Sequence, residues 1–152
     1  MGYHTRLSFD AVCCFGYGAI FQCHWFSGSW SASQVPLFIA DKELFAVVMA
    51  AYLWDPTWAF RRVEFLCDNE AVVSNLNSGT SRDPHLKALL CYLSLLLMQY
   101  SFSFRSSVQG KNNPIADSLS LLQFQCFRRL ASLANREATP IPPSLLADLQ
   151  VV

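Results

Sequence analysis

The chain has 152 residues, a length that favours a single domain large enough to bury its own hydrophobic core. Hydrophobic residues make up 53% and charged residues 14%, which excludes a disordered polypeptide and predicts apolar surface that a partner or neighbouring domain covers. Eleven basic and eleven acidic residues give zero formal net charge, so contact with a nucleic acid has to come from local patches rather than from long-range attraction.

The cysteines and apolar segments give no sign of secretion or of a membrane span. The six cysteines form no CxxC pair and no Cys/His spacing typical of zinc sites, and most lie in apolar stretches, as expected of reduced thiols. The first ten residues lack the apolar segment of a signal peptide. The longest apolar run, residues 88–98, is too short to cross a hydrocarbon core of about 30 Å. We therefore expect a cytoplasmic or nuclear chain that is not secreted.

The first third of the chain predicts three strands and a helix. Residues 6–12 and 19–24 have the composition of strands separated by a Gly-rich turn, and a further turn at residues 27–29 predicts a three-stranded antiparallel meander. Apolar residues then recur at three- and four-residue spacing over residues 41–54, which predicts a helix that stops before Pro56.

The middle of the chain predicts a strand followed by two helices. Residues 62–67 form a short apolar strand that leads directly into a helix start at residues 68–71, and this helix ends near Gly79. The next helix, residues 84–100, is opened by Asp83 as N-cap with a proline at the first helical position. It is apolar on most sides, which predicts that it is buried.

The last third predicts one more strand and two helical segments. Residues 101–106 read as the strand, and residues 114–120 and 122–133 as helices. We therefore place one domain at residues 5–134 and a Pro-rich linker, with the start of a following region, at residues 135–152. The element order predicts an α/β fold: a five-stranded mixed sheet, with a three-strand antiparallel meander plus two parallel strands, flanked by helices.

Four acids stand out by their positions. Asp10 lies inside an apolar strand, Asp68 ends another strand, and Glu43 and Asp117 lie in the first turns of two helices. Because strand ends and helix starts meet at one edge of a sheet with parallel strands, these carboxylates can converge. Converging carboxylates need a cation, and hard oxygen ligands select Mg²⁺ or Mn²⁺. Two such ions can promote phosphodiester hydrolysis.

Each acid also has a simpler interpretation. Asp68 can cap the helix that follows it, Glu43 can complement a helix dipole, and Asp117 can lie in solvent near its helix start. Asp10 is the hardest to explain in this way, because an acid within an apolar strand needs a partner. Only the arrangement of all four makes a metal site competitive with these interpretations.

Several segments resemble the ribonuclease H domain of retroelement reverse transcriptases. They are DA at residues 10–11, GYGAIF at residues 16–21, KEL at residues 42–44 and CDNEAVV at residues 67–73. Two more, LNSGTSRDPHL at residues 76–86 and GKNNPIADSLS at residues 110–120, are similar to the DIRS group, the retrotransposons that integrate with a tyrosine recombinase. The resemblance runs from about Arg6 to the Pro-rich tail.

This resemblance implies a ribonuclease H-type endoribonuclease that cuts the RNA strand of RNA–DNA hybrids during reverse transcription and leaves a 3′-hydroxyl. Asp10, Glu43, Asp68 and Asp117 match the four acids of the family that bind two Mg²⁺ ions, which Mn²⁺ can replace. The implied partners are the hybrid and the neighbouring reverse transcriptase and recombinase regions of a polyprotein. No membrane is involved.

One departure from the family pattern bears on activity. Relatives usually carry a histidine before a Pro-Gly turn, and that histidine is thought to assist turnover, whereas this chain has Ser107-Val108-Gln109-Gly110. This departure is what a degenerate copy of the retroelement domain would show. The alternative function is a catalytically idle module that binds nucleic acid or packs on a reverse transcriptase. Arg82 and Lys111, on loops that lead into predicted helices, are the best candidates for phosphate contacts.

Overall fold

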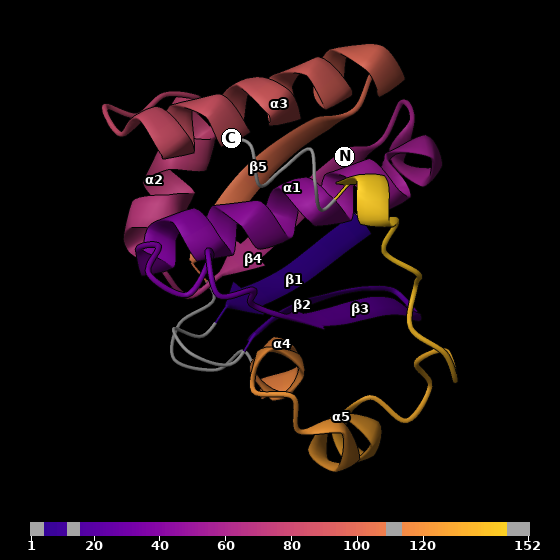
Figure 1. Cartoon of the computed structure of the whole chain (residues 1–152). Coiled ribbons are helices and arrows are strands. Elements are labelled where there is room, and N and C mark those ends of the chain that lie inside the picture. Colours follow the sequence, from indigo (N-terminus) through magenta and orange to yellow (C-terminus); the bar gives the residue numbers. More distant parts are fainter. Residues whose placement is uncertain (1–4, 12–15, 109–113, 146–152) are drawn as a thin grey trace.

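The computed structural model describes residues 5–11, 16–108 and 114–145, apart from the side chains of Thr5 and Asp10 (Figure 1). In chain order its elements are β1 (Thr5–Ala11), β2 (Gly16–Phe21), β3 (His24–Ser29), α1 (Ile39–Trp58), β4 (Arg62–Cys67), α2 (Glu70–Ser78), α3 (Pro84–Tyr100), β5 (Ser103–Val108), α4 (Pro114–Ser120) and α5 (Phe124–Leu130).

The five strands form one mixed sheet in the order β3-β2-β1-β4-β5. The strands β1, β2 and β3 pair antiparallel as a meander, whereas β4 pairs parallel with both β1 and β5. In the first parallel pair Ser8 lies opposite Leu66, and in the second Leu66 lies opposite Ser107. The predicted α/β fold is confirmed, and the topology is ribonuclease-H-like.

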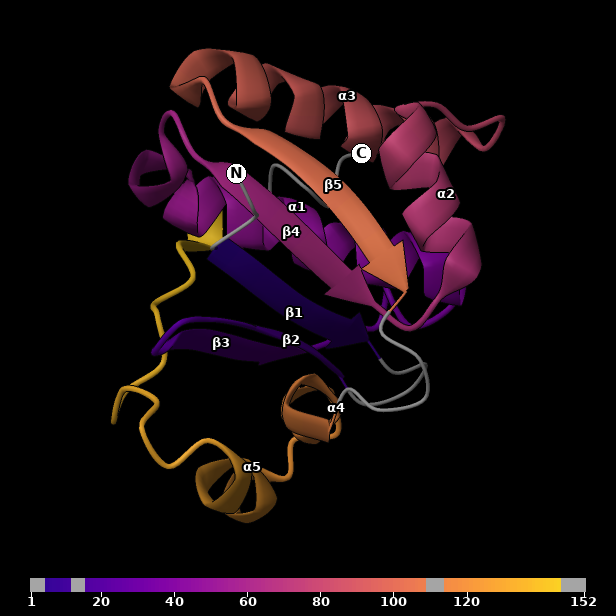
Figure 2. The same cartoon turned by 180° about the vertical axis from the view of Figure 1, so that it is seen from behind.

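Helices cover the two faces of the sheet in different places. In Figures 1 and 2, α1, α2 and α3 lie on one face, and α4 and α5 lie on the other face beside the meander. The main core is on the α1 side, where Leu7, Phe9 and Phe65 are completely buried. A smaller core on the other side joins Trp25 of β3 to Leu119 and Phe127 of α4 and α5. Because side chains alternate between the two faces along each strand, the same sheet contributes residues to both cores.

The predicted turn at residues 27–29 was wrong, because the meander turns earlier. The chain reverses at residues 22–23, where Gln22 has a φ of 54°, and β3 then continues through Gly28 to Ser29. A Cβ atom on Gly28 would lie 2.3 Å from the hydroxyl oxygen of Tyr17. Gly28 therefore marks the place where the tyrosine ring crosses the neighbouring strand, and not a turn.

The predicted end of the first helix before Pro56 was also wrong, since α1 continues to Trp58 with Pro56 in its last turn. Trp54 and Trp58, on either side of the proline, are buried against the sheet, and burying two tryptophans outweighs the loss of one backbone hydrogen bond. The hydroxyl of Thr57 donates to the carbonyl oxygen of Trp54 over 2.6 Å. All four tryptophans are buried and pack in the two cores.

Residues 135–145 follow the edge of the meander. The backbone N–H groups of Asn135 and Thr139 donate to the carbonyl oxygens of Cys23 and Trp25, and Leu145 is buried in the main core. The domain boundary after residue 134 remains a prediction, although this first part of the tail packs on the domain. Over the described ranges, no helix combines the length and apolarity needed to cross a membrane.

Asp55, near the end of α1, is a buried carboxyl whose Oδ2 atom has no hydrogen-bond partner among the described residues. Burial raises its pKa to about 7. The pKa in the folded state thus lies above the unfolded value of about 3.9, so the folded state holds an extra proton between these values. The associated stability is complete below the unfolded pKa and is lost as the pH rises through 7.

We therefore expect the free energy of unfolding to fall between pH 5 and pH 8 by about 2–3 kcal/mol more in the wild type than in Asp55→Asn. Asparagine has nearly the same shape and cannot ionise, so the difference isolates this one group. Urea unfolding followed by circular dichroism over that pH range measures it. Parallel pH profiles for the two proteins would show that Asp55 is solvated.

Candidate metal centre

The structure brings Glu43 of α1 to the end of β4, where the strand leads into Asp68. One ligand atom from each of Glu43, Cys67 and Asp68 lies within 4.8 Å of the others. Glu43 and Cys67 are buried and Asp68 is exposed, so the group opens to solvent through Asp68. Two of the four predicted acids are therefore neighbours at the carboxyl end of a parallel strand, the edge at which α/β sheets usually bind ligands.

Glu43 is only 4% exposed, although it lies near the start of its helix. A role limited to offsetting the helix dipole does not require the carboxylate to leave water. Its Oε2 atom instead accepts a hydrogen bond from the Cys67 thiol over 3.3 Å. A buried carboxylate with a thiol donor and a second acid beside it suits a cation better than it suits solvent.

Asp68 does not cap the helix that follows it, because the neighbouring Asn69 does. The Asn69 side-chain oxygen accepts hydrogen bonds from the backbone N–H groups of Ala71 and Val72, at 2.9 and 3.3 Å. This removes the simpler interpretation of Asp68, whose carboxylate is left at the strand end beside Glu43. The helix start predicted at residues 68–71 is confirmed, with α2 beginning at Glu70.

Cys67 is the member of this group that the sequence did not single out. Burial raises the pKa of its thiol, and the nearby carboxylates of Glu43 and Asp68 raise it further, so the sulfur keeps its proton and acts as a donor. The available signal was its place in β4, where it shares a face with Val63 and Phe65. That face packs against α1, the helix that carries Glu43.

Asp10 lies in the part of β1 that approaches the same edge. The parallel pairing of β1 with β4 ends at Ser8 and Leu66, two residues before Asp10 and two residues before Asp68. Both chains therefore run toward the same edge of the sheet as they reach these acids. The side chain of Asp10 lies outside the described part of the structure.

Asp117 is carried by α4, on the other face of the sheet. This helix packs directly on the meander, because a Cβ atom on Gly18 would lie 2.4 Å from the Cβ atom of Leu119, and Gly18 is the residue that pairs with Asp10. Asp117, two residues before Leu119, is half-buried. Among the described side chains it does not join the group formed by Glu43, Cys67 and Asp68. The register places its helix beside Asp10.

Ser107, at the position where relatives usually have histidine, lies near the end of β5. Its hydroxyl donates to Glu64 Oε1 over 3.2 Å. Glu64 also forms ion pairs with Arg6 at 3.5 Å and Arg105 at 3.7 Å, both through largely exposed guanidinium groups. Ser107 is therefore part of a polar network on the open face of the sheet.

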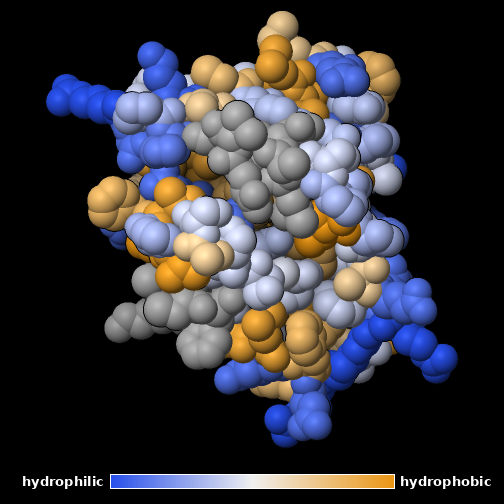
Figure 3. Space-filling model, in the orientation of Figure 1, coloured by the Kyte–Doolittle hydropathy of each residue, from blue (hydrophilic) through white to orange (hydrophobic). Residues whose placement is uncertain are grey.

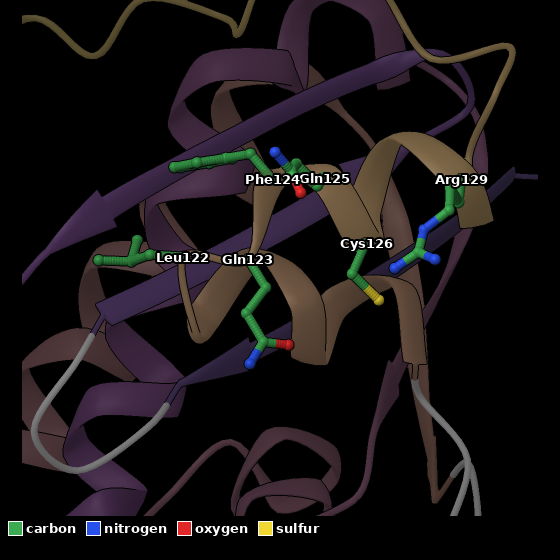
Figure 4. Close-up of a pocket in the computed structure, with 6 residues that line it drawn as sticks. All are labelled: Leu122, Gln123, Phe124, Gln125, Cys126 and Arg129. Carbon is green, nitrogen blue, oxygen red and sulfur yellow. The ribbon is translucent and has the colours of Figure 1, made fainter.

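The two predicted phosphate contacts are less informative. Arg82 is exposed on the loop between α2 and α3, and Lys111 lies outside the described residues. A separate hollow of about 580 Å³ lies beside α5 and includes none of the candidate acids (Figure 4). It is lined by Leu122, Gln123, Phe124, Gln125, Cys126 and Arg129.

Comparison with known proteins adds no assignment: no protein-family model matches the chain, and no curated protein matches its sequence significantly. The fold and the geometry of the acids therefore carry the functional argument.

The roles of Asn69 and Asp68 predict opposite effects on stability in metal-free buffer. Asn69→Ala removes the helix cap and should lower the free energy of unfolding by about 1 kcal/mol. Asp68→Asn should leave it unchanged or slightly raised, because it removes one of two neighbouring acidic groups. Urea unfolding of both variants measures this. If Asp68→Asn lowers the free energy of unfolding as much as Asn69→Ala does, the main role of Asp68 is to stabilise the helix and not to bind a ligand.

Proposed function

We propose that this protein is a metal-dependent endonuclease that hydrolyses the RNA strand of RNA–DNA hybrids during retroelement reverse transcription. The observation that carries the proposal is the convergence of Glu43 and Asp68 at the carboxyl end of β4, next to β1, the strand that carries Asp10. The ribonuclease-H-like topology and the ordered series of segments in the sequence support the same activity.

The donor set fits Mg²⁺ or Mn²⁺. The carboxylates of Glu43 and Asp68 supply hard oxygen ligands, and Asp10 and Asp117 belong to elements that meet at the same part of the sheet. Without a bound ion, burial and the nearby carboxylates raise the pKa of the Cys67 thiol, which donates a hydrogen bond to Glu43. Bound divalent cations would supply an activated water and stabilise the charge that develops on the phosphate.

The residues of the chain have distinct tasks in this scheme. Glu43 is held out of solvent, and Cys67 fixes its orientation by donating to Oε2. Asn69 holds the start of α2, which leaves the Asp68 carboxylate available to a cation. Because these contacts exist before any ligand binds, little reorganisation is needed when a phosphate enters.

A catalytically idle module that binds nucleic acid, or packs on a reverse transcriptase, is the second candidate. Ser107 favours it, because serine has no group that titrates near neutral pH at the position where relatives usually have histidine. The two candidates share the fold and the metal site and differ only in the chemical step.

A cleavage assay separates them. With Mg²⁺ and an RNA–DNA hybrid labelled on the RNA strand, we expect the wild type to produce shorter RNA fragments ending in a 3′-hydroxyl. Asp68→Asn and Glu43→Gln should abolish cleavage, because each removes an oxygen ligand. Glu70→Gln is the matched control, since Glu70 is an exposed acid two residues from Asp68 and outside the group. A wild type that binds the hybrid but leaves it intact with both Mg²⁺ and Mn²⁺ is the idle module.

Cys67 provides a finer test of the geometry. Cys67→Ala removes the donor to Glu43 and should slow cleavage by about tenfold or more, as the loss of an orienting contact to a metal ligand typically does. Cys67→Ser keeps a donor and should retain most of the rate. Single-turnover rates measure both, and Cys91→Ala, at an exposed cysteine of α3, is the control. Equal losses in the alanine and serine variants would point to core packing instead.

A further inference from the structure

A second feature of interest lies at the C-terminal end of α1, whereas the group formed by Glu43, Cys67 and Asp68 lies near its N-terminal end. A pocket of about 260 Å³ lies between the last turns of α1 and α3. Its lining comes from both helices: Tyr52, Asp55, Pro56, Leu96, Gln99 and Tyr100. On α3 the three lining residues recur at three- and four-residue spacing, so they form one face of that helix.

Asp55 gives the pocket its chemical character. The residue is 1% exposed, and its Oδ2 atom has no hydrogen-bond partner among the described residues. Leaving a buried carboxylate oxygen unsatisfied is costly. Asp55 lines the pocket with almost no accessible surface, so a donor that pushes between α1 and α3 there would satisfy an acceptor for which the described residues supply no partner.

Exposed apolar side chains lie near the same ends of α1 and α3. Tyr52 at its edge is 40% exposed, and Leu95, one helical turn before Gln99 on α3, is 65% exposed. Phe60 is 88% exposed, and its backbone N–H donates to the carbonyl oxygen of Ser101, directly after α3. Figure 3 shows apolar residues among the polar ones over α3, along the top of the molecule. Apolar surface around a buried polar group is typical of a protein-binding hot spot.

We propose that the α1–α3 pocket binds an arginine side chain of a partner polypeptide, with the flanking apolar residues of that partner covering Tyr52, Phe60 and Leu95. Asp55 would accept hydrogen bonds from the guanidinium group, and Gln99 offers a further acceptor.

Size and chemistry favour an arginine over other ligands. The volume is below that of most pockets for drug-sized molecules or cofactors and suits a single side chain. A single carboxylate is too few ligands for a divalent cation, whereas a planar guanidinium pairs with carboxylates and packs against aromatic rings such as those of Tyr52 and Tyr100. The low charge content of the chain agrees with an apolar surface that a partner covers.

The probe for this site is N-acetyl-arginine amide, and its control is N-acetyl-citrulline amide, which has nearly the same shape without the charge. Both are titrated into ¹⁵N-labelled protein in mildly alkaline buffer, with the acid group at the other end of α1 left intact. We expect the arginine probe to shift amide signals at residues 52–56 and 96–100, with saturation, and the citrulline probe to bind at least about tenfold more weakly.

Variants link the binding to Asp55. Asp55→Asn should fold and weaken arginine binding by about tenfold or more, because the charged acceptor is lost. Tyr52→Leu should weaken it less, since it keeps apolar packing and removes the aromatic ring and its hydroxyl but not the charged acceptor. Asp41→Asn changes another buried acid of α1 with an oxygen that has no hydrogen-bond partner among the described residues, and it should have no effect on arginine binding.

Three results would overturn the proposal. Equal binding of the two probes would exclude recognition of the guanidinium, and unchanged binding to Asp55→Asn would exclude the carboxylate. Dimerisation of the free protein in sedimentation velocity, abolished by Asp55→Asn, would assign the surface to a second copy of this chain. Cleavage of an RNA–DNA hybrid involves the opposite end of α1 and is not expected to change in Asp55→Asn or Tyr52→Leu.

Discussion

The burial of the Glu43 carboxylate is the constraint on which the site depends. An acid that is 4% exposed near a sheet edge has lost most of its water, and a protein tolerates this only where other groups replace the solvent. The Cys67 thiol supplies one hydrogen bond, and the neighbouring Asp68 adds a second acid rather than a counter-charge. The proposed divalent cation would supply a counter-charge here, and Asp10 lies on β1, the strand paired parallel with β4.

Much of the fold could be predicted from the sequence, because the patterns that specify it are local. The start of α2, the proline-initiated α3 and the parallel pairing of β4 with β5 follow from residues adjacent in the chain or from the order of the elements. The errors arose where distant residues decide the outcome. Gly28 resembles a turn until the Tyr17 ring occupies the space above it, and Pro56 resembles a stop signal until Trp58 is buried.

The site was predicted in part for the same reason. The strand-end position of Asp68 and the helix position of Glu43 are visible in the sequence, but their contact depends on how α1 crosses the sheet. Asp68 and Asn69 compete as caps for one helix start, and residue type alone does not choose between them. Cys67 resembled an ordinary small core residue, and its hydrogen bond to Glu43 emerges only when the helix is placed.

Helix α1 carries three buried acids, Asp41, Glu43 and Asp55, and the last two lie in contrasting surroundings. Glu43 and Asp55 are twelve residues apart, or about 18 Å along the axis. Glu43 has a thiol donor and a second acid beside it, which suits a cation. Asp55 shares its pocket with two tyrosines, and its Oδ2 atom has no hydrogen-bond partner among the described residues, which suits a single positively charged side chain. One helix thus connects a proposed catalytic end to a proposed docking end, as expected of a domain that works beside others.

The most direct test of the central claim is the stoichiometry of Mn²⁺ binding, measured by electron paramagnetic resonance on the protein without nucleic acid. The account predicts saturable binding to the wild type, loss of binding in Asp68→Asn and Glu43→Gln, and unchanged binding in Glu70→Gln. Wild-type binding that is absent, or that survives in Asp68→Asn and Glu43→Gln, would show that the acids at the end of β4 are not a metal site.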